Sequence, residues 1–230
     1  MTKSAIILAG GMGTRLKSVI QDIPKPMAPV NGQPFLTYVL DYLAAYGITE
    51  VVLSVGYRYE VILAHFGYDY KDISIRYSIE HEPLGTGGAI YQATKLLQET
   101  SFFAMNGDSL FKVDLSELAD FAKTKEAAVA LALKEMWDID RYGIVDIDEH
   151  QRVKAFKEKQ PVAYGLINGG VYWMTTKAFK VESFPKRFSF EKDFLEKHTE
   201  TLKMYACPLE GYFIDIGIPT DYAKAQLEIV

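Results

Sequence analysis

The sequence predicts an α/β fold, in which helices flank a mostly parallel sheet. Short runs rich in isoleucine and valine alternate with stretches of helical period, an order that is typical of βαβ units. Most of these runs are continuously apolar, as expected for strands that are covered on both faces. In the first part of the chain we expect strands at residues 4–9, 51–55, 73–79, 102–105 and 127–133.

Two apolar stripes between these runs indicate helices that lie against the sheet. They consist of Leu36, Val39, Leu40 and Leu43, and of Leu115, Leu118, Ala119 and Ala122. Each set keeps the three- and four-residue spacing of one helix face. Pro34 suits the first turn of the earlier helix, and Asp114 is suited to cap the later one. Residues 73–79 alternate between apolar and polar side chains, which indicates an edge or half-exposed strand.

The pattern loosens from about residue 137, where shorter strands alternate with polar connections. We expect strands at residues 143–147, 170–174, 204–206 and 212–214, and a closing helix at residues 219–227. This part is expected to form an inserted or appended subdomain that shares one core with the first part. In an open α/β sheet, the cleft lies beyond the carboxyl ends of the strands. Motifs at those ends are therefore the candidates for function.

The composition narrows the class of protein. Of the 230 residues, 49% are hydrophobic and 24% are charged, which is ordinary for a globular chain. The net charge is −5 and the charges are interspersed, so no basic face points to nucleic acid. A single cysteine, Cys207, excludes an internal disulfide framework, and the apolar run 5–9 is too short for a signal peptide or membrane span. We therefore expect a cytoplasmic protein that binds neither nucleic acid nor membrane.

The first expected strand runs directly into a glycine-rich turn. Residues 8–16 read LAGGMGTRL, and residues 24–26 read PKP. The glycines leave backbone N–H groups unshielded, so that a phosphate can approach closely, and Arg15 and Lys25 supply matching positive charge. The pattern predicts a triphosphate-binding turn, although glycines alone are as often found in an ordinary turn.

Two familiar phosphate-binding motifs do not fit this turn. The dinucleotide-binding pattern requires a small residue where Leu16 stands. The P-loop requires glycine, lysine and then serine or threonine, a sequence that does not occur in this chain.

Two aspartates each follow an expected apolar strand. Asp108 comes after residues 102–105 and Asp215 after residues 212–214. An isolated aspartate at such a place is more often a turn former or a helix cap. As a pair, the two carboxylates predict one Mg²⁺ site that holds a nucleotide and a second phosphate. The four histidines, at positions 65, 81, 150 and 198, are not spaced as zinc ligands.

Taken as a block, residues 8–36 resemble the sugar-1-phosphate nucleotidyltransferases, also called nucleotide-sugar pyrophosphorylases. Three later motifs agree in order: residues 82–89 (EPLGTGGA) resemble the base-recognition loop of that family, residues 106–108 (NGD) its metal-binding strand end, and residues 213–217 (FIDIG) its second metal site. The resemblance implies a Rossmann-like sheet of the nucleotide-diphospho-sugar transferase type with a smaller sugar-binding subdomain. It implies one domain over residues 1–230, with residues 1–136 mainly binding the nucleotide and residues 137–230 mainly binding the sugar phosphate.

The resemblance also implies roles for particular residues. The implied catalytic residues are Arg15, Lys25, Asp108 and Asp215, of which the two aspartates hold Mg²⁺. The implied nucleotide-binding residues are Leu8, Ala9, Gly10, Gly11, Gly13, Thr14, Glu82, Gly85 and Thr86. The implied sugar-phosphate-binding residues are Asn106, Gly143, Glu158, Lys159, Asn168 and Gly170. Arg15 would stabilise the departing pyrophosphate, and Lys25 would neutralise the phosphates near the reacting phosphorus.

The sugar side departs from the family pattern at one position. Gln160 stands between Lys159 and Pro161, whereas the family usually shows Glu-Lys-Pro without an insertion. Lysines are crowded at positions 154, 157 and 159. The alternative interpretation is therefore that this stretch is a solvated surface segment rather than part of the sugar-phosphate site. Tyr172 and Trp173 lie in an apolar run and are expected to be core residues.

Glu82 favours guanine as the base. A carboxylate accepts both adjacent N–H donors of guanine, whereas uracil and thymine place acceptors on either side of a single N–H. The alternatives are that Glu82 is a solvated loop charge, or that backbone groups of Leu8, Ala9 and Gly85 read the base.

The implied chemistry requires no general base. A sugar 1-phosphate has a second pKa near 6, so the attacking oxygen is mostly ionised at neutral pH.

Residues 17–20 (KSVI) and 166–172 (LINGGVY) look most similar to family members that transfer a guanylyl group from GTP to D-glycero-α-D-manno-heptose 1-phosphate, for bacterial surface glycans. The alternatives are a uridylyl- or thymidylyltransferase acting on a hexose or amino-sugar 1-phosphate, and a nucleotide-sugar-binding regulatory protein. The sequence leaves the oligomeric state open, a homo-oligomer included.

Overall fold

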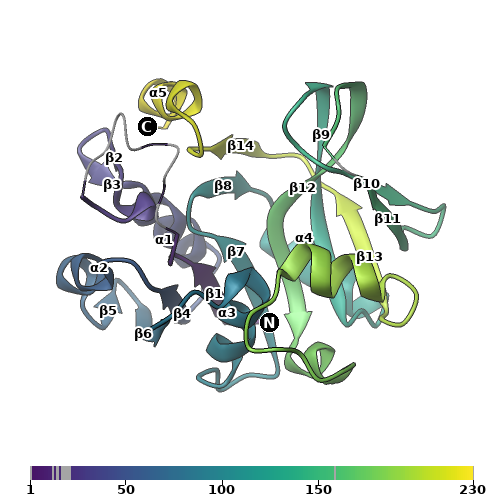
Figure 1. Cartoon of the computed structure of the whole chain (residues 1–230), viewed down its shortest axis with the longest axis horizontal. Coiled ribbons are helices and arrows are strands. Elements are labelled where there is room, and N and C mark those ends of the chain that lie inside the picture. The colour runs from purple at the N-terminus through teal and green to yellow at the C-terminus, as the bar shows by residue number, and fades with distance from the viewer. Residues whose placement is uncertain (1, 12, 14–15, 17–21, 158, 230) are drawn as a thin grey trace.

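Ten strands of the described chain form one central sheet (Figure 1). The structure is a computed structural model that describes residues 2–11, 13, 16, 22–157 and 159–229. The strands of the sheet are β1 (Ser4–Leu8), β4 (Glu50–Val55), β5 (Asp69–Tyr70), β6 (Ile73–Ile79), β7 (Ser101–Asn106), β9 (Val129–Ile139), β10 (Ile144–Ile147), β11 (Val153–Lys157), β12 (Val162–Thr175) and β13 (Met204–Pro208). Their order is β11-β10-β12-β7-β1-β4-β6-β5, with β9 also paired to β12 and β13 paired to β9.

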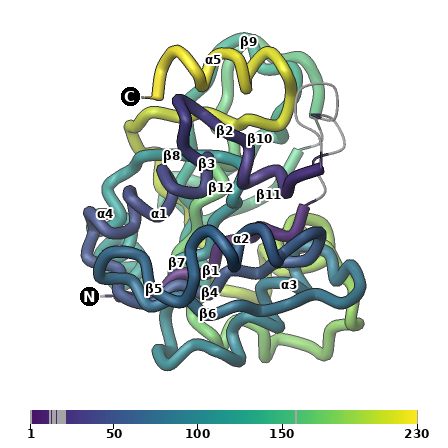
Figure 2. Tube along the Cα trace, turned by 90° about the vertical axis from the view of Figure 1, so that its left-hand side faces the viewer, coloured from purple at the N-terminus to yellow at the C-terminus, as the bar shows by residue number. Residues whose placement is uncertain are grey.

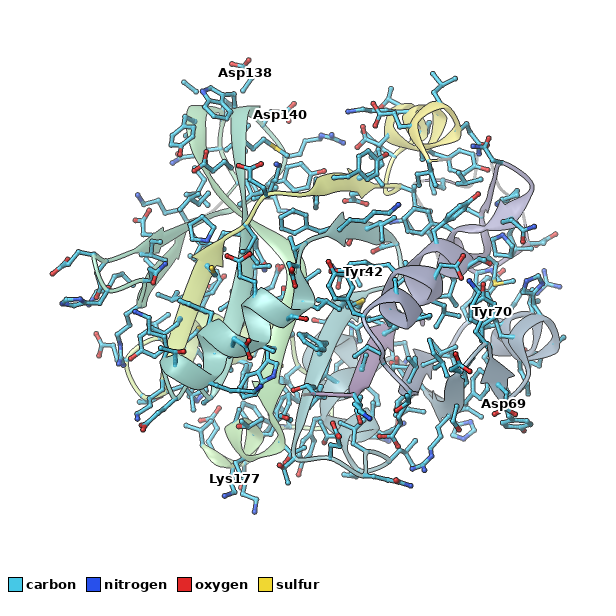
Figure 3. The ribbon with its side chains drawn as sticks, turned by 180° about the vertical axis from the view of Figure 1, so that it is seen from behind. Tyr42, Asp69, Tyr70, Asp138, Asp140 and Lys177 are labelled. Carbon is cyan, nitrogen blue, oxygen red and sulfur yellow. The ribbon has the colours of Figure 1, made fainter. Side chains whose placement is uncertain are left out.

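The direction of the strands changes between β7 and β12. Strands β7, β1, β4 and β6 run parallel to one another. Strand β12 runs antiparallel to β7, with Tyr172 opposite Ala104. The hydrogen-bonded sheet therefore continues from the first part of the chain into the second. Figure 3 shows the two ends of the molecule, with Asp69 and Tyr70 at one end and Asp138 and Asp140 at the other.

Helices cover both faces of the sheet (Figure 2). They are α1 (Phe35–Ala45), α2 (Tyr59–Phe66), α3 (Gly85–Thr94) and α4 (Leu115–Thr124), together with a π-helical segment at Phe190–Leu195. Helix α5 (Pro219–Glu228) instead contacts strands β2 and β14, which lie outside the central sheet. The described residues form two hydrophobic cores, and alternate residues of β1 contribute to each. Ile7 packs with residues of α1 and α4, and Ile6 packs with residues of α3 and the π-helical segment. Burial on both faces explains why the strands read as continuous apolar runs.

Two small antiparallel sheets, each of two strands, lie outside the central sheet. One consists of β2 (Pro29–Val30) and β3 (Gln33–Pro34), and the other pairs β8 (Ser109–Lys112) with β14 (Tyr212–Asp215). Figure 1 shows β14 beside β8, and α5 following β14 toward the β2–β3 hairpin. Residues far apart in the sequence are thereby brought to one end of the parallel strands.

The helix boundaries follow local sequence chemistry. The Asp114 carboxylate accepts hydrogen bonds from the backbone N–H groups of Ser116 and Glu117, so the expected cap of α4 is confirmed. Pro34 lies one residue before α1 rather than in its first turn. The motif 82–89 is a loop only as far as Leu84, because helix α3 begins at Gly85.

Several strands are longer than the sequence predicts. Strand β12 covers Val162–Thr175 instead of residues 170–174, and β9 covers Val129–Ile139 instead of residues 127–133. The two pair with each other over most of their length, and this cross-strand pairing outweighs the glycines that obscure the strand pattern. The sequence does not predict strand β11, which places Lys154 and Lys157 at exposed positions of an edge strand. No helix among the described residues is long and apolar enough to cross a membrane.

Candidate active site

The carboxyl ends of β1, β4, β6 and β7 open onto a pocket of about 690 Å³. In open α/β sheets, ligands bind at this edge, at the point where the order of the strands switches direction. Here that point is β1, because β4 lies on one side of it and β7 on the other. The pocket is lined by Leu8, Gly10, Gly11, Lys25, Pro26, Gly56, Tyr57, Glu80, His81, Glu82, Pro83, Gly85, Thr86, Ala89, Asn106 and Asp108. The predicted binding residues among them come from three separate stretches of the sequence.

At one end of the pocket, a buried lysine lies between the two predicted aspartates. The Nζ atom of Lys25 is 2.5 Å from Oδ2 of Asp108 and 3.7 Å from Oδ1 of Asp215. The Lys25 side chain is 8% exposed, whereas the two carboxylates are 37% and 30% exposed. The ammonium is therefore held inside the protein by carboxylates that themselves reach solvent.

Backbone pairing brings the two aspartates together. Asp108 lies in the turn between β7 and β8, and Asp215 ends β14, opposite Ser109 of β8. The N–H of Ile216 donates to the carbonyl of Asp108 at 3.0 Å. Oδ1 of Asp215 accepts a hydrogen bond from Gly217 N at 2.7 Å, which fixes that carboxylate. Local hydrogen bonds thus set the separation of two residues that are distant in sequence.

The two aspartates fit a Mg²⁺ ion in the chemistry of their donor atoms. Mg²⁺ prefers hard oxygen ligands and is held by one or two carboxylates together with substrate phosphates and water. In the part of the chain that the structure describes, no group of three or more metal-ligating side chains surrounds a common point. The ammonium of Lys25 occupies the place between the carboxylates where positive charge is favoured. Asp108 and Asp215 would therefore hold Mg²⁺ together with substrate phosphates.

The glycine-rich turn approaches Lys25 closely. A Cβ at Gly13, whose φ is +58°, would lie 2.9 Å from Cβ of Lys25. A Cβ at Gly11 would have no described atom within 4 Å, and Gly11 lines the pocket. Gly13 is therefore required by packing, whereas Gly11 borders open space. Thr14 and Arg15 lie outside the described residues.

The glycines of the motif 82–89 are explained by packing within the protein. A Cβ at Gly85, whose φ is +69°, would lie 2.5 Å from the carbonyl oxygen of Phe188, and one at Gly88 would lie 2.6 Å from that of Lys186. The N–H of Gly87 donates to the carbonyl of Phe188 at 3.0 Å. The segment 186–188 thus rests on the first turn of α3. Thr86 takes part as well, because its Oγ1 accepts from Phe190 N at 2.9 Å.

Glu82 lies at the exposed rim of the pocket. Its carboxylate forms an ion pair with Lys186, and their side chains are 63% and 70% exposed. The hydrogen bond from Lys186 and the charge of that ammonium lower the pKa of Glu82. The predicted base-reading carboxylate therefore already has a cationic partner from the segment 186–188.

The predicted sugar-side residues are brought together only in part. Asn106 lines the pocket, and Gly170 lies beside it, since a Cβ at Gly170 would be 2.9 Å from Nδ2 of Asn106. The Asn168 side chain accepts from Gly170 N at 3.1 Å and donates to the Tyr172 hydroxyl at 2.7 Å. Tyr172 itself is buried, as expected for a core residue.

Two of the remaining sugar-side residues, Gly143 and Lys159, lie around β10 and β11. Gly143 packs against β11, because a Cβ there would be 2.9 Å from the carbonyl oxygen of Lys157. Lys159 is exposed, and Glu158 lies outside the described residues. Burial and the nearby charge of Asp215 raise the pKa of Tyr142 to about 12, so its hydroxyl stays protonated at neutral pH.

Sequence reasoning missed a third carboxylate in the pocket, beside Glu82 and Asp108. Glu80 follows the last residue of β6, and its N–H donates to Val55 O at the end of β4. The rule that drew attention to Asp108, a carboxylate directly after a strand, applies equally to Glu80. Tyr57, His81 and Lys186 were also missed, since exposed residues in loops carry no periodic signal.

Comparison with known proteins identifies the family. A family model described as nucleotidyl transferase matches residues 4–230. The chain belongs to the nucleotidyl transferase family.

Three relatives match nearly the full length of this chain, and for two of them the match also covers nearly their own full length. The D-glycero-α-D-manno-heptose 1-phosphate guanylyltransferase of Aneurinibacillus thermoaerophilus is 51% identical over 98% of this chain and 97% of its own length. The enzyme of the same name from Campylobacter jejuni is 50% identical over 95% of this chain and 96% of its own. The mannose-1-phosphate guanylyltransferase of Mycobacterium tuberculosis is 34% identical over 98% of this chain and 64% of its own length.

Solved structures confirm the fold of this nucleotidyl transferase. The crystal structure of HddC from Yersinia pseudotuberculosis complexed with GMP-PN has a TM-score of 0.89 and 37% identity, with 100% of each chain covered. A putative glucose-1-phosphate thymidylyltransferase from Bacillus anthracis has a TM-score of 0.86 at 19% identity, over 97% of this chain and 94% of its own. The predicted α/β fold, with a mostly parallel sheet between helices, is therefore confirmed.

Proposed function

We propose that the chain transfers a guanylyl group from GTP to D-glycero-α-D-manno-heptose 1-phosphate. A phosphate oxygen of the sugar phosphate attacks the α-phosphorus of GTP. The bond from that phosphorus to the oxygen bridging to the β-phosphorus breaks, and pyrophosphate leaves with the electron pair. The products are GDP-heptose and pyrophosphate.

The observation that carries this proposal is the 50% and 51% identity to two heptose 1-phosphate guanylyltransferases over nearly the whole chain. The match to a structure complexed with GMP-PN supports a guanine nucleotide as one substrate. The site supports the same chemistry, because Lys25, Asp108 and Asp215 meet at the end of a pocket that opens at the carboxyl ends of the parallel strands.

The residues of the site act by positioning and by balancing charge. Lys25 would shift from the two carboxylates toward the phosphates and offset the charge that grows on them during transfer. Gly10 and Gly11 leave room for the polyphosphate beside the end of β1. Fixing two phosphorylated substrates for in-line attack contributes roughly 7–11 kcal/mol to lowering the barrier. Arg15 is proposed to contact the leaving pyrophosphate.

Asp108 and Asp215 would hold the metal ion. Mg²⁺, when bound there, would neutralise phosphate charge and make the α-phosphorus more electrophilic. The sugar phosphate is proposed to lie toward Asn106, Asn168 and Gly170, on the side of the pocket that faces β12, with Gly143 and Lys159 farther out along β10 and β11. Glu158 is proposed to contact the sugar phosphate as well. A cytoplasmic location, where GTP is available, follows from the proposed substrates.

A panel of substrates tests this function directly. Each of GTP, UTP, dTTP and ATP is combined with heptose 1-phosphate, mannose 1-phosphate or glucose 1-phosphate, and pyrophosphate release is measured with Mg²⁺ present. The proposal predicts the highest kcat/KM for GTP with heptose 1-phosphate. A higher value for UTP or dTTP with a hexose 1-phosphate would contradict it. Binding of GDP-heptose without turnover of any pair would indicate a regulatory protein instead.

A further inference from the structure

The β9–β10 loop, which consists of residues 140–143, is tied to helix α5 by an ion pair. Nη2 of Arg141 lies 2.9 Å from Oδ2 of Asp221, in the first turn of α5. The Arg141 side chain is 42% exposed and that of Asp221 is 19% exposed. Nε of Arg141 also lies 3.5 Å from Oδ1 of Asp140, but Asp140 belongs to the same loop. Among the described residues, the pair with Asp221 is therefore the ion pair that joins this loop to another element.

Aromatic packing connects the same loop to the strand that carries Asp215. The ring of Tyr142 packs edge-on against Phe213 of β14, with the ring centroids 5.7 Å apart. Phe213 lies two residues before Asp215, and its ring packs in the same way against Phe111 of β8, also at 5.7 Å. A Cβ at Gly169 of β12 would meet the ring of Phe111. The loop, the end of β14 and the sugar side of β12 thus form one continuous row of packed residues.

Side chains hold this loop in place, because its backbone is weakly attached. Within the described chain, residues 140–143 make no backbone-to-backbone hydrogen bond outside the regular helices and strands. Gly143 approaches the carbonyl of Lys157, but that contact faces β11 and not β14 or α5. The guanidinium of Arg141 lies 5.6 Å from the centre of the Tyr142 ring, within the range of a cation–π contact. The position of the loop relative to Asp215 therefore depends on the side chains of Arg141 and Tyr142.

The Arg141–Asp221 pair is too exposed to be explained by folding stability. Exposed ion pairs contribute little to the free energy of unfolding, since water and salt screen them and both side chains lose freedom. Arg141 is also absent from the described residues that line the pocket. A pair that contributes little to stability and does not line the pocket can still affect the reaction, by setting where the loop lies.

We infer that Arg141 is a positioning residue, which holds the β9–β10 loop against α5 so that the sugar side of the site keeps a fixed place relative to Asp215. This inference rests on the transfer to a sugar 1-phosphate in the proposed function. Helix α5 begins four residues after Asp215, so a loop attached to its first turn keeps its register with the strand that carries this carboxylate. In-line attack depends on such register, because a misplacement of about 1 Å can lower the rate about 100-fold.

Arg141→Met tests this role. Methionine keeps an unbranched apolar side chain beside Tyr142 but removes every donor to Asp221. Pyrophosphate release is measured with Mg²⁺ while each substrate is varied at saturating levels of the other. We expect KM for the sugar 1-phosphate to rise about 10-fold and kcat to fall up to about 10-fold, whereas KM for GTP stays within about twofold. The Tm should change by no more than about 2–4 °C.

Asp221→Ala completes the test, because it breaks the same ion pair and leaves Arg141 in place. It should raise KM for the sugar 1-phosphate as much as Arg141→Met does. The double variant should be no worse than either single variant, since the two residues act through one contact. If Arg141 instead bound the sugar phosphate directly, Arg141→Met would raise this KM and Asp221→Ala would not. That result would overturn the positioning role.

Arg76→Met is the matched control. Nη1 of Arg76 lies 3.3 Å from Oε1 of Glu50, and the two side chains are 39% and 12% exposed. Glu50 is the first residue of β4, at the edge of the sheet opposite the pocket. Arg76→Met should lose at least as much stability as Arg141→Met, because Arg76 also donates to the carbonyl of Leu96. Both KM values and kcat should nevertheless stay unchanged. An equal rise of the sugar KM in this control would show that lost stability is the cause and would overturn the inference.

Failure of this inference can be told from failure of the proposed function. The variants are assayed with the nucleotide and sugar 1-phosphate that the unmodified chain turns over fastest. If that pair is UTP or dTTP with a hexose 1-phosphate, the guanylyltransferase proposal is overturned, and the changes in sugar KM still decide the role of Arg141. If GTP and heptose 1-phosphate are turned over but neither Arg141→Met nor Asp221→Ala changes the sugar KM, the role of Arg141 alone is overturned. Turnover of no pair would overturn both.

Discussion

The ammonium of Lys25 lies 2.5 Å from Oδ2 of Asp108 and 3.7 Å from Oδ1 of Asp215, inside the site that the two carboxylates form. One positive charge thus offsets part of two negative charges that would otherwise face each other at close range. A charge as buried as that of Lys25 requires such partners. In the free protein, the ammonium therefore balances the charge of two carboxylates that backbone pairing brings together, and we propose that a metal ion bound between them would replace it.

Replacing Lys25 by methionine should strengthen metal binding in the absence of nucleotide while it abolishes efficient catalysis. Two unit charges 4 Å apart interact by about 1 kcal/mol in water and about 4 kcal/mol near a protein surface. Removing the competing ammonium should therefore tighten Mn²⁺ binding at least about 10-fold. Free Mn²⁺ counted by electron paramagnetic resonance gives the affinity of the nucleotide-free protein. Lys123→Met, which removes an exposed lysine paired with Asp120, should leave the affinity unchanged. Equal or weaker Mn²⁺ binding in Lys25→Met would show that the ammonium does not compete with the metal.

Asp108→Asn should remove activity without unfolding the protein. The amide keeps the shape of the side chain and an oxygen acceptor for Lys25, but it supplies no negative charge to a metal ion. We expect kcat to fall by about 100-fold or more, with a change in Tm of only a few degrees. Pyrophosphate release and thermal unfolding are measured in parallel. Asp120→Asn, on the exposed face of α4, is the matched control. Activity close to that of the unmodified chain would remove Asp108 from the metal site.

The parallel half of the fold could be predicted from the sequence because its signal is local. Strands that are covered on both faces must be apolar throughout, and helices that rest on them must carry one apolar stripe, so residues 4–9 and Leu36 to Leu43 indicate their structure directly. The half that contains β9 to β13 carries a weaker signal. There Gly165, Gly169 and Gly170 interrupt β12, and pairing with β9 rather than local propensity keeps that strand extended.

The part of the candidate site that could be predicted from the sequence consists of charged residues near the ends of strands or beside the glycine-rich turn. Lys25, Asp108 and Asp215 lie together in the structure, as the motifs predict. What the sequence could not supply was the contact between α3 and the segment 186–188. That contact leaves no room for a Cβ at Gly85 or Gly88, and it brings Lys186 to Glu82. A tertiary contact between residues about a hundred positions apart leaves no periodic trace.

The glycines of the two motifs should respond differently to alanine. Gly11→Ala meets no described atom within 4 Å, so the free protein should unfold at nearly the same temperature. The added methyl would occupy pocket space, and KM for GTP should rise about 10-fold. In Gly88→Ala, by contrast, the Cβ would lie 2.6 Å from the carbonyl oxygen of Lys186. Such overpacking lowers the free energy of unfolding by about 1–3 kcal/mol. For a chain of this size, each kcal/mol lowers Tm by roughly 2–4 °C.

Thermal unfolding and GTP saturation curves for both glycine variants decide this prediction. A Gly11→Ala variant with unchanged KM would mean that the polyphosphate does not pass Gly11. A Gly88→Ala variant as stable as the unmodified chain would mean that the segment 186–188 can withdraw from α3 at little cost.

Helix α5 should act at a distance by tying the strand that ends in Asp215 to β2, the strand that follows the 3-10 turn carrying Lys25. The hydroxyl of Tyr222 donates to the carbonyl of Pro29 at 2.5 Å, and Nε2 of Gln226 donates to the same oxygen at 2.7 Å. Tyr222→Phe should lower the free energy of unfolding by about 0.5–1.5 kcal/mol. It should also lower kcat up to about 10-fold, because small displacements of charged groups in a site are costly to the rate.

Tyr38→Phe is the matched control for this role of α5, since its hydroxyl donates to the neighbouring carbonyl of Val30 at 2.8 Å but comes from α1. The two variants should lose similar stability, because each loses one hydrogen bond of the same kind to the same hairpin. Only Tyr222→Phe should slow turnover, since only α5 continues directly from the strand that ends in Asp215. Equal kcat values in both variants would show that the β8–β14 pairing alone fixes Asp215 relative to Lys25.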